Sequence, residues 1–308
     1  MEERPGTPTP LESPLTSPKD TKEGNETGYF ANFALTQDRT ASVQNPSRAL
    51  LIPIFPPTTS ILQVAFMFTF RRFTIHDEHC AMKVGTDGVL LGAWAGIDGA
   101  CRVLDIGCGS GLIALMAAQR NASAQVTGVE IDENAVRDAI TNIQASPFAD
   151  RVRVIHADIL QLAGCDTDRT GGHAAFDCLL ANPPYHEEEL LPPSAARAAA
   201  RHTSGGLTFS ALLETATTLL DPDVPTASLS VVLPAQASSA FIPLAGKQGL
   251  YVSRRTDVIT RPGKPPKRIL LEFRLQPSMP VCEQLILMDE EGKRSKAYSD
   301  LCRDFYIK

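Results

Sequence analysis

The sequence predicts an α/β fold of the doubly wound type, with helices on both faces of a seven-stranded sheet that is mostly parallel. Strand-like apolar segments alternate with helical segments from residue 101 to residue 275, a pattern typical of parallel sheets with crossover helices. Residues 103–111 read as a strand, a glycine turn and the start of a helix. Several strand-like segments end in an acid or an amide, at the sheet edge where ligands of this fold class bind.

Length and composition are those of a globular protein without membrane, secretory or metal-binding signals. The chain has 308 residues, with 29 basic against 35 acidic side chains. No apolar run approaches the roughly 18 residues that a membrane helix needs, and the N-terminus lacks a signal-peptide pattern. Seven cysteines are scattered without a C-x-x-C pair, which indicates free thiols in a reducing compartment. We therefore expect a cytoplasmic protein with no metal site.

Residues 1–65 differ in composition from the rest of the chain. Nine of the 23 prolines lie in the first 60 residues, among many Ser, Thr, Glu and Asn residues. Such a segment cannot bury enough apolar area to offset the entropy lost on ordering. We interpret it as a disordered leader, which would be an upstream extension if translation began at Met67. The folded domain is expected to span residues 66–308.

An arm and a covering helix are expected before the first strand of the sheet. Residues 68–73 alternate apolar and polar side chains, as a strand or an ordered arm would. Thr86 or Asp87 is placed to cap a short helix that continues to residue 94. That helix would cover an edge of the sheet, and Lys83, Thr86 and Asp87 would line the mouth of a ligand pocket.

The core is expected to alternate strands and helices joined by right-handed crossovers. The strands are predicted at residues 101–105, 125–130, 152–157, 176–181, 228–233, 250–259 and 268–275. The helices are predicted at residues 111–120, 133–144, 208–220 and 236–247, with an exposed loop at 164–173. Beyond residue 277 the pattern weakens to an edge strand at 284–288 and a basic, aromatic tail at 293–308.

The glycine turn has the spacing G-x-G-x-G, formed by Gly107, Gly109 and Gly111. Dinucleotide-binding turns use G-x-G-x-x-G, and Leu112 stands where their third glycine would fall. Glycines without a Cβ allow a tight turn and a close approach of a ligand. Asp105, just before the turn, would repel a pyrophosphate but accept a hydrogen bond from an ammonium group. The alternative is a tight turn that binds nothing.

Acids also end the second and third predicted strands. Glu130 closes the segment 125–130, and Asp158 follows the segment 152–157. A carboxylate at the end of a second strand can bind both hydroxyls of a ribose. Either acid alone could be an ordinary turn residue, but acids at three successive strand ends favour a binding site.

The fourth predicted strand ends in Asn182-Pro183-Pro184-Tyr185. The Asn182 oxygen and the Pro183 carbonyl can accept hydrogen bonds from an exocyclic amino group. Two prolines make the turn rigid, and the Tyr185 ring offers a face on which a planar base can stack. The alternative is a Pro-Pro turn that only ends a buried strand.

These motifs resemble those of a known enzyme class. The run D-I-G-C-G-S-G at 105–111 resembles the cofactor loop of class I S-adenosylmethionine-dependent methyltransferases. The resemblance implies a Rossmann-like sheet whose last strand is antiparallel, with Asp158 near the adenine of the cofactor. The run N-P-P-Y resembles that of methyltransferases acting on adenine N6, guanine N2 or a glutamine amide.

Segments that flank these motifs favour one of the three methyl acceptors. Four of them resemble the family of bacterial tRNA(Val) (adenine-37-N6)-methyltransferases, namely residues 82–94, 254–258, 268–273 and 298–306. The resemblance covers residues 68–308, and it departs from the family where Cys108 stands in place of a frequent alanine. It implies methyl transfer from S-adenosyl-L-methionine to adenine 37 of a valine tRNA. Methylation of guanine N2 in rRNA or of glutamine N5 in a protein, and a non-catalytic RNA-binding module, remain the alternatives.

An RNA substrate would need local positive charge, because the net charge of −6 is unfavourable for nucleic acid. The basic candidates lie near the predicted strand ends, at Lys83, Arg197, Arg201, Arg261, Lys264 and Lys267. Each cluster could instead be a solvated face. We expect a monomer that binds the anticodon loop, where position 37 is single-stranded and is easily extruded.

Overall fold

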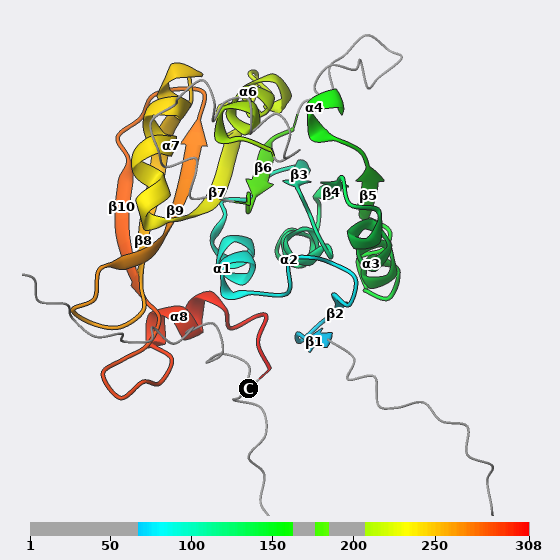
Figure 1. Cartoon of the computed structure of the whole chain (residues 1–308), viewed down its shortest axis with the longest axis horizontal. Coiled ribbons are helices and arrows are strands. Elements are labelled where there is room, and N and C mark those ends of the chain that lie inside the picture. The colour runs from blue at the N-terminus through cyan, green and yellow to red at the C-terminus, as the bar shows by residue number, and fades with distance from the viewer. Residues whose placement is uncertain (1–66, 163–175, 185–206, 308) are drawn as a thin grey trace, which may run out of the picture. The chain divides into compact units, whose positions relative to one another are not determined.

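The computed structural model describes residues 67–162, 176–184 and 207–307. Residues 61–308 form one compact unit, to which all of the described residues belong. The predicted leader and the predicted loop at 164–173 lie outside the described residues. Every other element predicted from the sequence falls within them and can be compared with the structure (Figure 1).

The main sheet has eight strands in the order β10-β8-β9-β7-β6-β3-β4-β5. In chain order the strands are β3 (Arg102–Ile106), β4 (Gln125–Glu130), β5 (Val152–His156), β6 (Cys178–Ala181), β7 (Ser228–Pro234), β8 (Tyr251–Ile259), β9 (Pro266–Arg274) and β10 (Val281–Ile286). The first seven are the predicted strands, and β10 is the predicted edge strand, which starts three residues earlier than expected. Within the described sheet every pairing is parallel except those of β9 with β7 and β8. The prediction of an antiparallel last strand is therefore confirmed, and it follows from the short β8–β9 connection.

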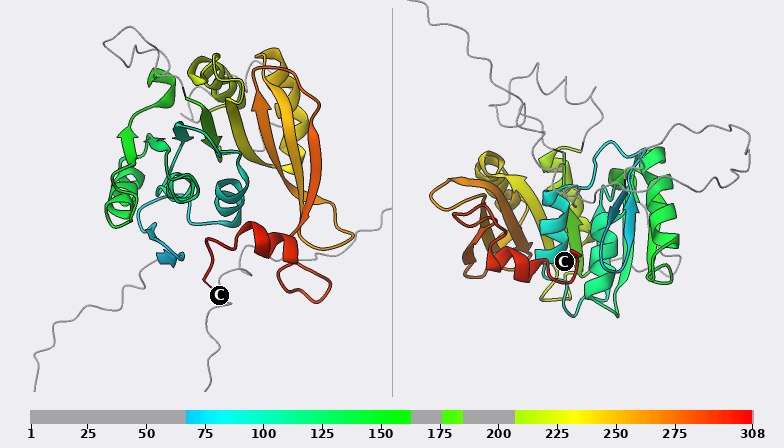
Figure 2. Two further views of the ribbon diagram at one scale, coloured as in Figure 1. Left: turned by 180° about the vertical axis from the view of Figure 1, so that it is seen from behind. Right: turned by 90° about the horizontal axis from the view of Figure 1, so that it is seen from below.

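Helices cover both faces of the sheet (Figures 1 and 2). One apolar cluster joins the sheet to α1 (Thr86–Trp94), α2 (Leu112–Arg120), α3 (Glu133–Gln144) and α8 (Lys296–Leu301). The other joins it to α4 (Ile159–Leu162), α6 (Phe209–Leu219) and α7 (Ala235–Lys247). Neighbouring strand residues point to opposite faces, so that Val103 belongs to the first cluster and Leu104 to the second.

Of the strand or ordered arm predicted over residues 68–73, the structure forms an ordered arm, which is a small hairpin rather than one strand. Strands β1 (Met67–Thr69) and β2 (Thr74–His76) pair antiparallel in a sheet of their own. The chain turns between Phe70 and Phe73, whose rings stack with centroids 4.8 Å apart and are both buried. The turn places both aromatic rings on the same side, where they are buried together. The free energy gained by this burial outweighs the preference of the alternating pattern for a continuous strand.

Helix α1 packs closely against α2, but it is not capped as predicted. Its N-cap is Gly85 and no side chain caps it, whereas we expected Thr86 or Asp87 in that role. The Asp87 carboxylate instead forms an ion pair of 2.7 Å with Arg268 at the start of β9. A Cβ at Gly92 would lie 2.7 Å from the Met116 sulfur, so this glycine permits the close approach of the two helices.

Candidate functional site

The predicted site residues follow strand ends that the sheet aligns at one edge. Ile106 at the end of β3 is in register with Val129 of β4 and with Ala181 of β6. Glu130 is in turn in register with His156 at the end of β5. The glycine turn, Glu130, Asp158 and Asn182 therefore all emerge at the carboxyl edge of the sheet, as the sequence predicted.

All three glycines of the turn have the left-handed backbone that glycine adopts at low cost. Their φ angles are 67° at Gly107, 53° at Gly109 and 85° at Gly111. The Gly107 and Cys108 amides both donate to the Val129 carbonyl, at 2.9 and 3.1 Å, which ties the turn to β4. A Cβ at Gly107 would meet nothing within 4 Å, so the backbone at this glycine is open to a ligand.

Replacing Gly128 with alanine should destabilise the protein by about 1–3 kcal/mol. A Cβ at this position would lie 2.7 Å from the Cys108 sulfur and 3.0 Å from the Cys108 Cβ, so β4 or the glycine turn must shift. Urea unfolding of the variant and the wild type measures the effect. Gly246→Ala in α7 is the control, because its Cβ would meet nothing within 4 Å. Equal loss of stability in both variants would contradict the steric explanation.

Asp105 lies fully buried beneath the turn. Its Oδ2 accepts a hydrogen bond of 3.0 Å from the Ala114 amide in α2. Its Oδ1 has no hydrogen-bond partner among the described residues. Burial raises the pKa of the Asp105 carboxyl to about 7, against the lowering effect of the Ala114 amide. A buried carboxylate with one oxygen unsatisfied is suited to a ligand that brings a positively charged donor.

Glu130 links the end of β4 to the glycine turn. Its Oε2 accepts from the Gly109 amide at 2.9 Å. Its Oε1 accepts from the amides of Ile131 and Asp132, at 2.9 and 3.0 Å. The side chain therefore has a structural role, and Oε2, which accepts only one of these hydrogen bonds, can accept a further one from a ligand.

The remaining predicted cofactor residues also have local roles. Asp158 accepts from the Leu160 amide at 3.0 Å and precedes the short helix α4, so it acts as a helix cap. Thr86 is the first residue of α1, and Asp87 holds Arg268. These contacts leave the predicted binding roles of Asp158, Thr86 and Asp87 as proposals.

Asn182 lies half-buried at the end of β6, followed by the buried Pro183 and the exposed Pro184. Its Nδ2 donates to the sulfur of Met82 at 3.4 Å. Tyr185 lies outside the described residues. Met82 is not among the predicted site residues, and the sequence around it carries no local signal for a contact with a residue a hundred positions later.

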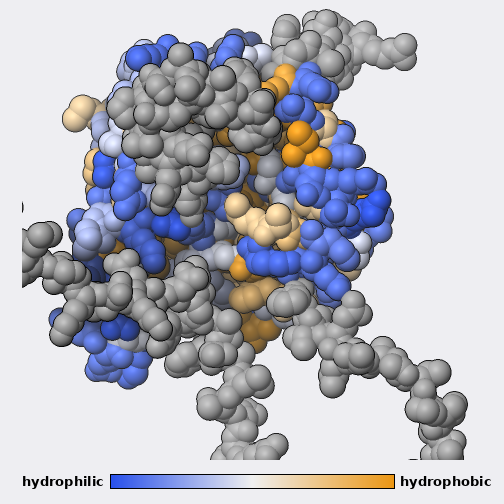
Figure 3. Space-filling view, in the orientation of Figure 1, coloured by the Kyte–Doolittle hydropathy of each residue, from blue (hydrophilic) through white to orange (hydrophobic). Residues whose placement is uncertain are grey.

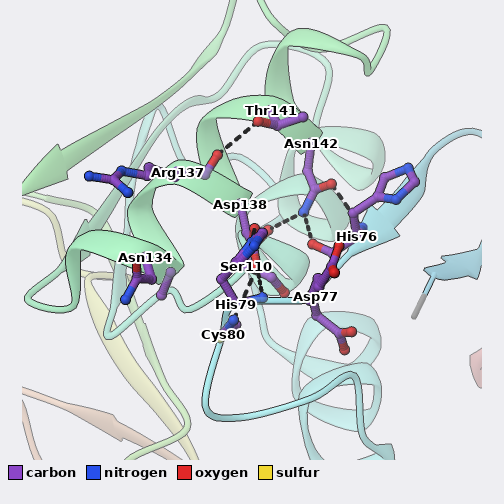
Figure 4. A network of polar contacts seen from close by, with 12 residues as sticks. His76, Asp77, His79, Cys80, Ser110, Asn134, Arg137, Asp138, Thr141 and Asn142 are labelled. Atoms are coloured by element: carbon purple, nitrogen blue, oxygen red, sulfur yellow. Dashed lines mark hydrogen bonds and ion pairs between the residues drawn. The ribbon is translucent and has the colours of Figure 1, made fainter. Parts of the chain in front are cut away.

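Two side chains of α3 hold residues 76–80, which lie just before Met82 (Figure 4). Asp138 accepts from the backbone amides of His79 and Cys80, at 2.8 and 3.0 Å, and contacts His79 Nδ1 at 2.9 Å. Asn142 bonds the His76 backbone on both its N–H and C=O, at 2.9 and 2.8 Å, and donates to the Ser110 carbonyl at 2.9 Å. The segment is thereby fixed against the glycine turn. The signal for these contacts in the sequence was a pair of polar residues on the buried face of an amphipathic helix.

The basic residues divide into three groups. Arg261, Lys264 and Lys267 are exposed on or beside the β8–β9 loop, which lies at the carboxyl edge because Ile259 pairs with Pro266. Lys83 is exposed and donates to the carbonyls of Asp77 and Glu78. Arg197 and Arg201 lie outside the described residues.

The described part of the chain has neither a cluster of metal ligands nor a membrane-spanning helix. No group of three or more His, Cys, Asp or Glu side chains there could hold a metal ion. In the same residues, no helix combines the length and the apolar character required to cross a bilayer.

Comparison with known proteins identifies the family. Residues 90–208 match the family model of the methyltransferase small domain. A tRNA1(Val) (adenine(37)-N6)-methyltransferase of Yersinia pestis strain Pestoides F is 43% identical over 241 residues, which are 78% of this chain and 93% of the relative. The chain belongs to this methyltransferase family. An enzyme of the same name from Yersinia pseudotuberculosis has the same identity and coverage.

A solved structure agrees with the fold of this methyltransferase family. A predicted O-methyltransferase from Agrobacterium tumefaciens superposes with a TM-score of 0.54 at 22% identity, covering 71% of this chain and 96% of its own. The region matched by the family model contains the glycine turn, Glu130, Asp158 and Asn182. The aligned strand ends therefore lie within the region that matches the family model.

Proposed function

We propose that this enzyme transfers a methyl group from S-adenosyl-L-methionine to the N6 amino group of adenine 37 in the anticodon loop of a valine tRNA. The observation that carries the proposal is the register of β3 with β6, which places Asn182 beside the glycine turn. The named relatives supply the identity of the tRNA and of the base. Methylation of guanine N2 or of a glutamine amide is the second candidate, since the Asn-Pro-Pro turn suits any flat amino group.

The residues present fit this cofactor. The unsatisfied Oδ1 of Asp105 suits its ammonium group, and the open backbone at Gly107 suits close approach of its chain. Glu130 would accept from the ribose hydroxyls. When bound, the cofactor supplies a methyl group on a positively charged sulfur, which is a strong electrophile.

Two apolar side chains extend this site beyond the predicted residues. Ile131 is 60% exposed directly after Glu130, and Leu160 is 45% exposed shortly after Asp158. Figure 3 shows apolar atoms exposed between α4 and the helices α1 and α2, within a largely hydrophilic surface. We assign Ile131 and Leu160 to the two sides of the cofactor's adenine, with Asp158 at its edge.

Positioning accounts for the reaction without a strong base. The amino group of adenine is a poor nucleophile, because its lone pair is delocalised into the ring. The amino group would donate its two hydrogens to Asn182 Oδ1 and to the Pro183 carbonyl. These two hydrogen bonds favour a tetrahedral nitrogen whose lone pair faces the methyl group. Nitrogen then bonds to the methyl carbon as the carbon–sulfur bond breaks, and the nitrogen loses one proton to solvent.

The tRNA would be held by phosphate contacts around this edge. Lys83, Arg261, Lys264 and Lys267 are the described candidates, and Arg197, Arg201 and the stacking Tyr185 belong to the proposal from the sequence. Binding of the extruded base by a monomer in the cytoplasm completes the proposed function.

Methylation of tRNA from a strain that lacks the modification tests this proposal. Incubation with the protein and methyl-labelled cofactor should place the label in N6-methyladenosine, at position 37 of valine tRNA, as read by mass spectrometry of nucleosides and of nuclease fragments. Label in N2-methylguanosine, or in a protein amide after incubation with cell extract, would support the second candidate instead. No label with any of these acceptors would overturn both.

A further inference from the structure

The Asn182 amide is in contact with a flexible side chain that is not part of the core. Met82 is 49% exposed, yet its sulfur lies 3.4 Å from Asn182 Nδ2. The backbone just before Met82, at residues 76–80, is held by Asp138, which is 7% exposed, and by Asn142, which is fully buried. The anchored segment therefore presents a thioether to the amide at the end of β6.

A thioether sulfur accepts hydrogen bonds but donates none. The terminal torsion of an asparagine side chain is broad and roughly two-fold, so its oxygen and nitrogen exchange places easily. Beside an acceptor, the orientation that directs Nδ2 toward the sulfur is favoured over the one that directs Oδ1 toward it. In the favoured orientation Oδ1 points away from the sulfur, as acceptance from a substrate amino group requires.

We propose that Met82 is a positioning residue for methyl transfer, which acts by selecting the productive orientation of the Asn182 amide. This inference rests on the proposed function, because it assigns Asn182 Oδ1 to the substrate. Met82 would touch neither the cofactor nor the base in this role. Its substitution should therefore lower kcat while leaving both binding steps intact.

Met82→Leu is the decisive variant, because leucine keeps the apolar volume and removes the acceptor. We expect kcat for tRNA methylation to fall about two- to fivefold, the range of a weak hydrogen bond. The KM for tRNA, the Kd for S-adenosylhomocysteine and the Tm should stay at their wild-type values. The control is Met279→Leu, the same substitution at a residue that is 91% exposed and precedes β10, at the opposite edge of the sheet.

Repeating the Met82 substitution in an Asn182→Asp protein distinguishes an effect on the orientation of the Asn182 amide from an effect on packing. Asn182→Asp keeps an acceptor oxygen but has no amide N–H to donate to the sulfur, so adding Met82→Leu to it should lower kcat no further. An unchanged kcat in Met82→Leu, an equal fall in Met279→Leu, or a full additional loss in the double variant would overturn the proposal. Absence of adenine methylation by the wild-type protein would instead overturn the proposed function itself.

Discussion

Replacing Asn182 with alanine should lower kcat for tRNA methylation by about a hundredfold or more and leave cofactor affinity unchanged. The amide is the proposed acceptor for the reacting amino group, and loss of one preorganised partner at a reacting centre typically costs about 10²–10³ in kcat. Asn182 follows β6, with its amide directed at Met82. None of the described contacts of the turn involves it, so the cofactor side should keep its geometry.

Two measurements check this result together. Single-turnover methylation of unmodified valine tRNA measures the chemical step, and calorimetric titration with S-adenosylhomocysteine measures cofactor binding. Asn182→Asp is the matched variant, because it retains an acceptor oxygen, and it should keep more activity than alanine. An alanine variant with wild-type turnover would show that another group holds the amino nitrogen.

Replacing Asp105 with asparagine should weaken S-adenosylhomocysteine binding by about tenfold to a hundredfold. A hydrogen bond to a charged group contributes about 1.5–3 kcal/mol, and Asp105 would provide such a bond to the ammonium of the ligand. The substituted side chain can still accept from the Ala114 amide, so the start of α2 should be retained. Binding at wild-type affinity would show that Asp105 only supports the turn.

The pH dependence of binding gives an independent check on Asp105. The carboxyl has a pKa of about 7 in the folded, cofactor-free protein, raised by burial. Only the ionised form attracts an ammonium, so affinity should fall as pH drops below 7, by about tenfold per unit. Titrations at pH 6 and pH 8 should show this fall in the wild type and a smaller one in Asp105→Asn. Equal pH dependence in the two proteins would contradict the assignment.

Stability should depend on the same group in the opposite direction. The pKa of Asp105 is higher in the folded state than the value of 3.8 for an ordinary aspartate, so the folded state binds this proton more tightly. Its contribution to the stability of the cofactor-free protein is therefore fully present below pH 3.8 and is lost as the pH rises to about 7. Cofactor binding would offset that cost, since the ammonium compensates the buried charge.

The positions of most strands and helices, and the glycine turn, follow from local rules that a single sequence displays. Alternation of apolar segments predicted the seven strands β3 to β9, and the family resemblance implied that β9 is antiparallel. Both are confirmed, but β10 makes the sheet eight-stranded rather than seven-stranded. The three positive φ angles of the turn need glycine, so Gly107, Gly109 and Gly111 are visible as letters. Alignment of parallel strand ends then brings Asp105, Glu130 and Asn182 to one edge, without any knowledge of packing.

Contacts between distant residues were decided only by the tertiary structure. Asp87 looked like a helix cap and instead pairs with Arg268, 181 positions later. Residues 68–73 looked like a strand or an ordered arm, and the turn that buries Phe70 and Phe73 together is seen only in the structure. The contact of Met82 with Asn182 likewise left no mark on either local pattern. Backbone sterics and periodicity act between near neighbours in the chain, whereas these pairings depend on how whole elements pack, and therefore on all of the sequence at once.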